Sequence, residues 1–214
     1  MKKYIKKILK PLVPKENILS RREKFNAREI QNWENNNKPL PPPHAVKQMV
    51  IQEFGERYKC SILVETGTFR GDMIEAQKYN FERLYSIELS QKLHSDAVRR
   101  FKGDSQVTIL QGDSGNVMPR LIPELENTTL FWLDGHYSSG VTAKGEKNCP
   151  IYKELDAIFK SSTLNHVLLI DDARCFNGTE DYPTLEELKN YMNSIRPNYS
   201  FKVEDDLIRC APQN

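Results

Sequence analysis

The sequence predicts a doubly wound α/β fold with a mostly parallel seven-stranded sheet that ends in an antiparallel hairpin. Five short apolar runs alternate with stretches of helical periodicity, which indicates βαβ units and a parallel sheet. These runs lie at 61–65, 83–88, 107–111, 129–134 and 166–171. The C-terminal segment YSFKVEDDLIRCA (199–211) instead predicts two antiparallel strands joined by a tight turn at Asp205 and Asp206.

The helices between the strands follow from apolar residues at three- and four-residue spacing. Val46, Met49, Val50 and Phe54 lie on one face of a helix at 45–58, which we expect to introduce the sheet. Further helices are predicted at 72–78, 90–101, 116–125, 151–160 and 185–195.

The N-terminal part of the chain differs in composition from the rest. We therefore divide the chain into an N-terminal extension with a proline-rich connector (1–44) and one domain (45–214). Residues 15–38 are polar and partly helical, and NNNKPLPPPH (35–44) predicts a stiff connector. The first ten residues, MKKYIKKILK, carry five lysines and no acid. A contact of residues 1–13 with an anionic membrane surface is one interpretation, and a solvated tail is the other.

Composition narrows the class of protein. The 214 residues suit one domain, and the net charge of +2 argues against a nucleic-acid partner. The four cysteines are scattered without a CxxC motif, which argues against a zinc site or a disulfide framework. No apolar run has the roughly 18 residues that a membrane span needs. We expect a cytoplasmic protein, with peripheral membrane contact at most.

Glycines and acids follow the first three predicted strands. The first strand runs into VETGTFRGDM (64–73), where Gly67 and Gly71 let the backbone approach a ligand ahead of a helix. Glu88 closes the second strand about twenty residues later, where an acid can accept both hydroxyls of a ribose. Asp113 follows the third strand. Together they predict a ligand that contains adenosine. The alternative is that Glu88 and Asp113 cap helices.

This order of motifs resembles the S-adenosylmethionine site of class I methyltransferases, whose fold ends in the same hairpin. The resemblance covers residues 45–211, with one departure: Phe69 stands where the E/D-x-G-x-G-x-G motif has its middle glycine. By position, Glu65 and Gly67 would lie near the methionine part, Glu88 at the ribose and Asp113 at the adenine. The implied cofactor-binding residues are Glu65, Thr66, Gly67, Thr68, Gly71, Glu88, Leu89, Gly112, Asp113, Ser114 and Asp134.

Three more acids follow the last two parallel strands: Asp134 after the fourth, and Asp171 and Asp172 after the fifth. Adjacent carboxylates at the end of a buried strand need a compensating partner. Because the first, fourth and fifth strands are neighbours in this fold, the three acids predict a site for a hard divalent cation, Mg²⁺ or else Mn²⁺ or Ca²⁺. In the alternative, one aspartate caps a loop and the other pairs with Arg174 or Lys144.

The acidic set resembles that of metal-dependent O-methyltransferases of the catechol and sugar-acting types. The Asp-Asp pair is closer to the sugar-acting type, which implies methylation of a hydroxyl on a small polyhydroxylated or glycan acceptor. A metal-bound hydroxyl has a lowered pKa, so Asp134 or His136 could take its proton. The loop 137–150 predicts a substrate-facing flap, and residues 176–183 predict another wall of the acceptor cleft.

Other classes of protein match less well. A nicotinamide-dependent oxidoreductase would need G-x-G-x-x-G after the first strand, and a nucleic-acid amino-methyltransferase would need Asn/Asp-Pro-Pro-aromatic after the fourth, where this chain has LDGHY (133–137). A metal-independent enzyme, or a non-catalytic scaffold of the same fold, remains the alternative.

Overall fold

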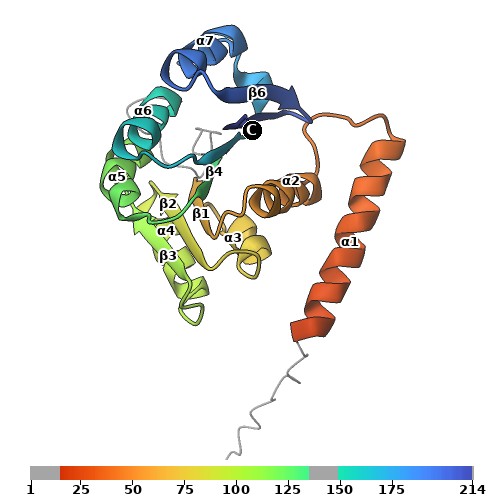
Figure 1. The fold of residues 1–214 in the computed structure, drawn as a ribbon. Coiled ribbons are helices and arrows are strands. Elements are labelled where there is room, and N and C mark those ends of the chain that lie inside the picture. The colour runs from red at the N-terminus through yellow and green to blue at the C-terminus, as the bar shows by residue number, and fades with distance from the viewer. Residues whose placement is uncertain (1–14, 135–148, 214) are drawn as a thin grey trace, which may run out of the picture.

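The computed structural model describes residues 15–134 and 149–213 and confirms the predicted sheet. Seven strands lie in the order β3-β2-β1-β4-β5-β7-β6 (Figure 1), and β7 runs antiparallel to both of its neighbours, β5 and β6, while the other pairs are parallel. The strands are β1 (Ile62–Thr66), β2 (Arg83–Glu88), β3 (Val107–Gln111), β4 (Thr129–Leu133), β5 (Val167–Ile170), β6 (Tyr199–Glu204) and β7 (Leu207–Pro212).

The register of the parallel strands places their carboxyl ends level. Thr66 at the end of β1 pairs with Ile87 in β2 and with Leu133 in β4. Leu133 in turn pairs with Ile170 at the end of β5. The residues that follow these strands therefore emerge at one edge of the sheet, which is where ligands bind in open α/β folds.

Helices cover both faces of the sheet. They are α2 (His44–Arg57), α3 (Asp72–Gln77), α4 (Gln91–Arg100), α5 (Ser114–Leu121), α6 (Ile151–Ser161) and α7 (Leu185–Ile195). Successive strand residues point to opposite faces. Leu63 and Leu130 belong to the core cluster that contains residues of α2 and α3. Their neighbours Val64 and Phe131 belong to the cluster with residues of α5, α6 and α7.

The helix α1 (Lys15–Asn35) lies outside these layers, along α2 and α3 (Figure 1). Arg22 donates to the carbonyl oxygens of Glu75 and Ala76, at 2.9 and 2.7 Å, where α3 ends. Trp33 is buried, and its indole N–H donates to the carbonyl oxygen of Pro39 at 2.8 Å. The predicted partial helix at 15–38 is thus confirmed, whereas the membrane-contact prediction for residues 1–13 lies outside the described residues. Within 15–134 and 149–213, no helix is both long and apolar enough to cross a bilayer.

Two local features show how the sequence sets the ends of elements. The helix predicted at 116–125 begins earlier, at Ser114, and changes at Ile122 into the short 3-10 helix η1 (Ile122–Glu124). Pro123 lacks the N–H that would continue the α-helical hydrogen bonds, which accounts for this change. The predicted hairpin turn is confirmed, because Asp205 and Asp206 have φ values of 52° and 61°, the left-handed pair that such turns require.

Candidate active site

The turn between β1 and α3 forms the first part of the site. Gly67 and Gly71 have φ values of 82° and 78°, which a side chain would strain. Phe69 also has a positive φ, 47°, and its backbone N–H donates to a carboxylate oxygen of Glu88 at 2.8 Å. The departure from the glycine motif at Phe69 therefore changes the side chain, which is 40% exposed, but keeps a left-handed backbone.

Glu88 connects this turn to the end of β2. Its carboxylate is buried and accepts two backbone hydrogen bonds, from Phe69 and from Ser90, each at 2.8 Å. It does not cap α4, because the Ser90 hydroxyl accepts from the Leu93 N–H at 3.4 Å and so takes that role. Each carboxylate oxygen can accept more than one hydrogen bond, so Glu88 retains capacity for a ligand hydroxyl. The carbonyl of Leu89 accepts from the Gln111 side chain at 3.2 Å, which joins β2 to β3.

Asp113 stands at the end of β3, after Gly112, whose φ is 141°. The Gly112 N–H donates to the carbonyl of Glu88 at 3.0 Å, which holds these two strand ends together. Asp113 occupies the position before α5 but makes no side-chain cap. Its Oδ1 is buried and accepts no hydrogen bond from the described residues. A buried acceptor without a donor is costly, and a ligand amino group would satisfy it.

Glu65 and the threonines beside it form a buried layer under the turn. The Ser86 hydroxyl donates to the Glu65 carboxylate, and Thr68 Oγ1 lies 2.6 Å from the same hydroxyl oxygen. Burial raises the pKa of Glu65 to about 8, and the charges of Glu88 and Asp72 add to this effect. Glu65 is therefore largely protonated at neutral pH, and its carboxyl group supports the turn from below. Thr66 is also buried, and its Oγ1 accepts from the backbone N–H of Asp134 at 3.2 Å.

Asp134, Asp171 and Asp172, which we call the acidic cluster, lie at the ends of β4 and β5. The backbone N–H of Asp171 donates to the carbonyl of Leu133 at 3.0 Å, which brings the two strand ends together. Burial raises the pKa of Asp134 well above its ordinary value, and the charges of Asp171 and Asp172 raise it further. Burial likewise raises the pKa of Asp171 to about 6.

A lysine that sequence reasoning missed lies in this cluster. Lys47 comes from α2, and its Nζ donates to Asp171 Oδ2 and lies 3.7 Å from Asp172 Oδ1. Burial acts against its ammonium form, but the charges of Asp171, Asp134 and Asp172 outweigh burial and raise the pKa of Lys47. Apart from its position on the helix before β1, no pattern in the sequence marks Lys47 as part of the site.

The second aspartate has a different partner. Arg174 Nη1 lies 2.9 Å from Asp172 Oδ1 and also contacts the buried Asp206 of the β6–β7 turn. The predicted alternative, in which one aspartate pairs with Arg174, therefore describes Asp172. Lys144, the other residue named in that alternative, lies outside the described residues.

The predicted site for a divalent cation does not fit this arrangement. Both carboxylate oxygens of Asp171 are engaged, Oδ2 by Lys47 and Oδ1 by the backbone N–H of Asp172 at 2.8 Å. Asp172 Oδ1 is engaged by Arg174. Among residues 15–134 and 149–213, no three His, Cys, Asp or Glu side chains form a group that could hold a metal ion. His136, the other predicted proton acceptor, lies outside these ranges.

A pocket of about 650 Å³ lies between the start of α6 and the loop after β5. The predicted cleft wall at 176–183 contributes to it. Burial raises the pKa of Tyr182, and Cys149 and Cys175 contribute more to this effect than the charges of Asp172 and Asp134 do. The lining residues are Asp113, Cys149, Pro150, Tyr152, Lys153, Asn177, Gly178, Asp181, Tyr182, Pro183, Thr184 and Glu187.

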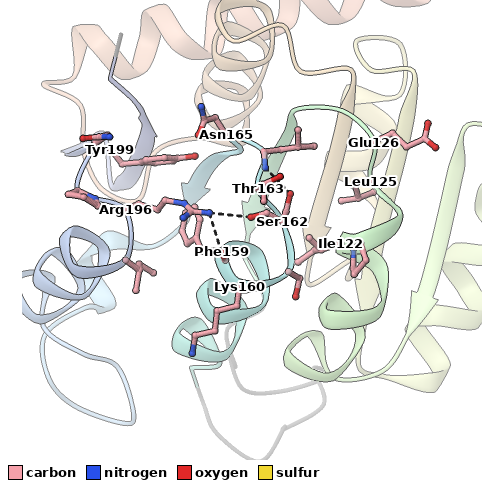
Figure 2. A pocket seen from close by; sticks show the side chains of 16 residues that line it. Ile122, Leu125, Glu126, Phe159, Lys160, Ser162, Thr163, Asn165, Arg196 and Tyr199 are labelled. Atoms are coloured by element: carbon pink, nitrogen blue, oxygen red, sulfur yellow. Dashed lines mark hydrogen bonds between the residues drawn. The ribbon is translucent and has the colours of Figure 1, made fainter.

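A second pocket, of about 770 Å³, lies at the opposite edge of the sheet, between the ends of α6 and α7 (Figure 2). Arg196 donates to the carbonyl oxygens of Phe159 and Ser162 at 3.1 and 3.2 Å, as Figure 2 shows. The last carbonyl oxygens of a helix have no hydrogen-bond partner within the helix, and the Arg196 guanidinium supplies one at the end of α6. No predicted site residue lines this pocket, so we do not assign it to the active site.

The strand order, the antiparallel β7 and the glycine turn after β1 define the Rossmann-like methyltransferase fold. Solved structures of methyltransferases share it. The O-methyltransferase TomG from Streptomyces achromogenes, in complex with SAM, aligns with a TM-score of 0.57 at 14% identity over 88% of this chain and 89% of its own. An O-methyltransferase from Bacillus cereus, in complex with SAH, aligns with a TM-score of 0.58 at 16% identity over 95% and 94%.

A third structure, a putative caffeoyl-CoA O-methyltransferase from Staphylococcus aureus, has a TM-score of 0.58 at 10% identity over 92% of this chain and 98% of its own. At these identities the likeness is one of fold. No protein-family model matches the sequence, and neither does any curated protein.

Proposed function

We propose that the protein is an S-adenosylmethionine-dependent O-methyltransferase that acts on a hydroxyl of a small polyhydroxylated or glycan acceptor. The observation that carries the proposal is the buried Asp113 Oδ1, an acceptor without a described donor, beside Glu88 and the glycine turn at one edge of the sheet. Two of the structures that share the fold, TomG and the Bacillus cereus enzyme, are in complex with SAM or SAH.

The residues present suit this cofactor. In the proposal, Glu88 accepts the ribose hydroxyls and Asp113 accepts the adenine amino group, while the backbone at Gly67 lies beside the methionine part. S-adenosylmethionine would supply an electrophilic methyl group bonded to a positively charged sulfur. Three of the other predicted residues, Glu65, Thr66 and Thr68, would act from beneath, since they are buried and connected to one another or to the strand ends.

Asp134 is the proposed proton acceptor. Burial and the charge of Asp171 raise the pKa of Asp134, and a carboxylate with a raised pKa is a stronger base than one with its ordinary pKa. The acceptor hydroxyl would give its proton to Asp134 as its oxygen forms the new bond to the methyl carbon, and the bond between that carbon and the sulfur would break, which would leave S-adenosylhomocysteine. His136 remains the other predicted candidate for this role.

The pocket between the start of α6 and the loop after β5 supports a polyhydroxylated acceptor. Tyr152 and Tyr182 supply aromatic surface, and Asn177, Asp181 and Glu187 supply polar groups. Aromatic surface combined with a few polar groups suits a sugar, which has both apolar and hydroxyl faces. Divalent-cation assistance, which the sequence predicts, is not part of this proposal because Lys47 and Arg174 engage the carboxylates.

Calorimetric titration with S-adenosylhomocysteine tests the cofactor assignment. We expect micromolar binding by the wild-type protein and a loss of at least about tenfold, or about 1.4 kcal/mol, in Glu88→Gln and Asp113→Asn. Glu82→Gln is the matched control, because Glu82 is exposed and precedes β2 at its far end. If the folded wild-type protein does not bind the compound, the methyltransferase proposal is wrong.

A second measurement addresses the acceptor. Transfer of a labelled methyl group to sugars and other vicinal diols would establish the reaction class. Cofactor binding without transfer to any hydroxyl compound would instead favour a non-catalytic binding module of the same fold.

A further inference from the structure

We propose that Lys47 is the resident cation of the acidic cluster, and that its ammonium group keeps divalent metal ions out of that cluster. The inference concerns the charge balance of the site and applies whichever reaction the site performs. It assigns to Lys47 the role of a positioning residue, because it acts through Asp171.

The first argument is the placement of the ammonium group. Lys47 Nζ contacts Asp171 Oδ2 and lies 3.7 Å from Asp172 Oδ1, so it sits between the two adjacent carboxylates. The Asp171 side chain is only 1% exposed and that of Lys47 only 16% exposed. A buried carboxylate needs a paired charge, and Lys47 is that partner for Asp171.

Both carboxylate oxygens of Asp171 and one of Asp172 already have donors. Asp171 Oδ1 accepts from the Asp172 N–H at 2.8 Å, and Asp172 Oδ1 accepts from Arg174 at 2.9 Å. A hard dication needs several oxygen ligands at 2.0 to 2.6 Å, roughly, around one point. To bind here it would have to displace Lys47 from Asp171 or lie against an ammonium group of the same sign.

The backbone that carries Lys47 and the backbone that carries Asp172 each have a defined conformation at the cluster. Its neighbours on α2, Val46, Val50 and Ile51, are fully buried, which fixes the backbone of α2 against the sheet. On the other side, Asp172 has left-handed backbone angles, φ 54° and ψ 48°, which set the direction of its side chain.

Manganese binding tests the proposal without a methyl donor, so its failure and the failure of the proposed function are separate results. Free Mn²⁺ is measured by its paramagnetic resonance signal as protein is added. We expect the wild-type protein and Lys47→Arg, which keeps the charge, to leave Mn²⁺ free at about millimolar concentration. We expect Lys47→Met, which keeps the side-chain volume, to bind one Mn²⁺ at least about tenfold more tightly than the wild type. The double variant Lys47→Met/Asp171→Asn should lose that binding.

Two results would overturn the proposal. One is tight binding of Mn²⁺ by the wild-type protein that Asp171→Asn removes. The other is a folded Lys47→Met protein that binds Mn²⁺ no better than the wild type. If thermal unfolding shows that Lys47→Met is not folded, Lys47→Gln takes its place in the same comparison. A gain of manganese binding in either variant, abolished by Asp171→Asn, supports the proposal.

Discussion

Replacing Glu154 by glutamine tests how strongly a buried carboxyl group near the candidate site makes stability depend on pH. Glu154 lies in the first turn of α6 and is 1% exposed, and the Ser114 hydroxyl donates to its Oε1 at 2.6 Å. Burial raises its pKa to about 7 from an ordinary 4.5, against the opposing effect of hydrogen bonds from Ser114 and Thr66. The charge of Asp113 raises it further.

The sign of the effect follows from linkage. A folded pKa above the unfolded one means that the folded state holds the proton more tightly. The contribution of Glu154 to stability is therefore fully present below about pH 4.5 and is lost as the pH rises to about 7. The difference between these two pKa values corresponds to about 3 kcal/mol. Glutamine carries no charge at any pH, so Glu154→Gln removes this dependence.

Urea unfolding at a series of pH values measures the effect. Relative to the wild type, the free energy of unfolding of Glu154→Gln should increase by about 2 to 3 kcal/mol between about pH 5 and pH 8. The control Glu82→Gln replaces an exposed glutamate and should follow the wild-type pH profile. Parallel pH profiles for Glu154→Gln and the wild type would refute the reasoning, because Glu154 would then be ionised at the same pH in both states.

Two further predictions concern local structure. Gly71→Ala places a side chain at φ 78° with its Cβ about 2.6 Å from the Phe101 ring, and should lower the free energy of urea unfolding by at least about 2 kcal/mol. Gly103→Ala meets nothing within 4 Å and should change it by less than about 1 kcal/mol, so equal effects would contradict this account. Thr184→Ala removes the capping box of α7 and should cost about 1 kcal/mol in thermal unfolding, whereas the mid-helix substitution Ser95→Ala should cost nothing.

The sheet was predictable because its strands are short, apolar and separated by helical periods. All five apolar runs became parallel strands. A strand buried on both faces is mostly apolar, as β5 is throughout and β4 is after Thr129. The start of α5 was not predictable to the residue. Its first turn contains the small polar residues Ser114, Gly115 and Asn116, which carry no apolar periodicity.

The backbone conformation of the glycine turn could not be predicted from the sequence at residue 69. A phenylalanine in the left-handed region is uncommon, so nothing in the residue type at 69 predicts its φ of 47°. The conformation follows from the surrounding contacts. The Phe69 N–H reaches the buried Glu88 carboxylate, and the glycines at 67 and 71 supply the other two positive φ values of the turn. The turn therefore departs from the glycine motif in residue type at position 69 but keeps a left-handed backbone there.

Unpaired charges in the sequence show that the acidic cluster needs a cation, but they do not identify that cation. Two adjacent aspartates after a buried strand do require compensation, and the structure supplies it. A count of carboxylates at strand ends indicates a metal ion, because Lys47, the cation that pairs with Asp171, leaves no mark at those positions. Lys47 comes from a helix 124 residues earlier in the chain and reaches Asp171 only through the packing of α2 on the sheet. Charge compensation is thus a requirement that the sequence reveals, whereas the choice between a lysine and a metal ion depends on long-range packing.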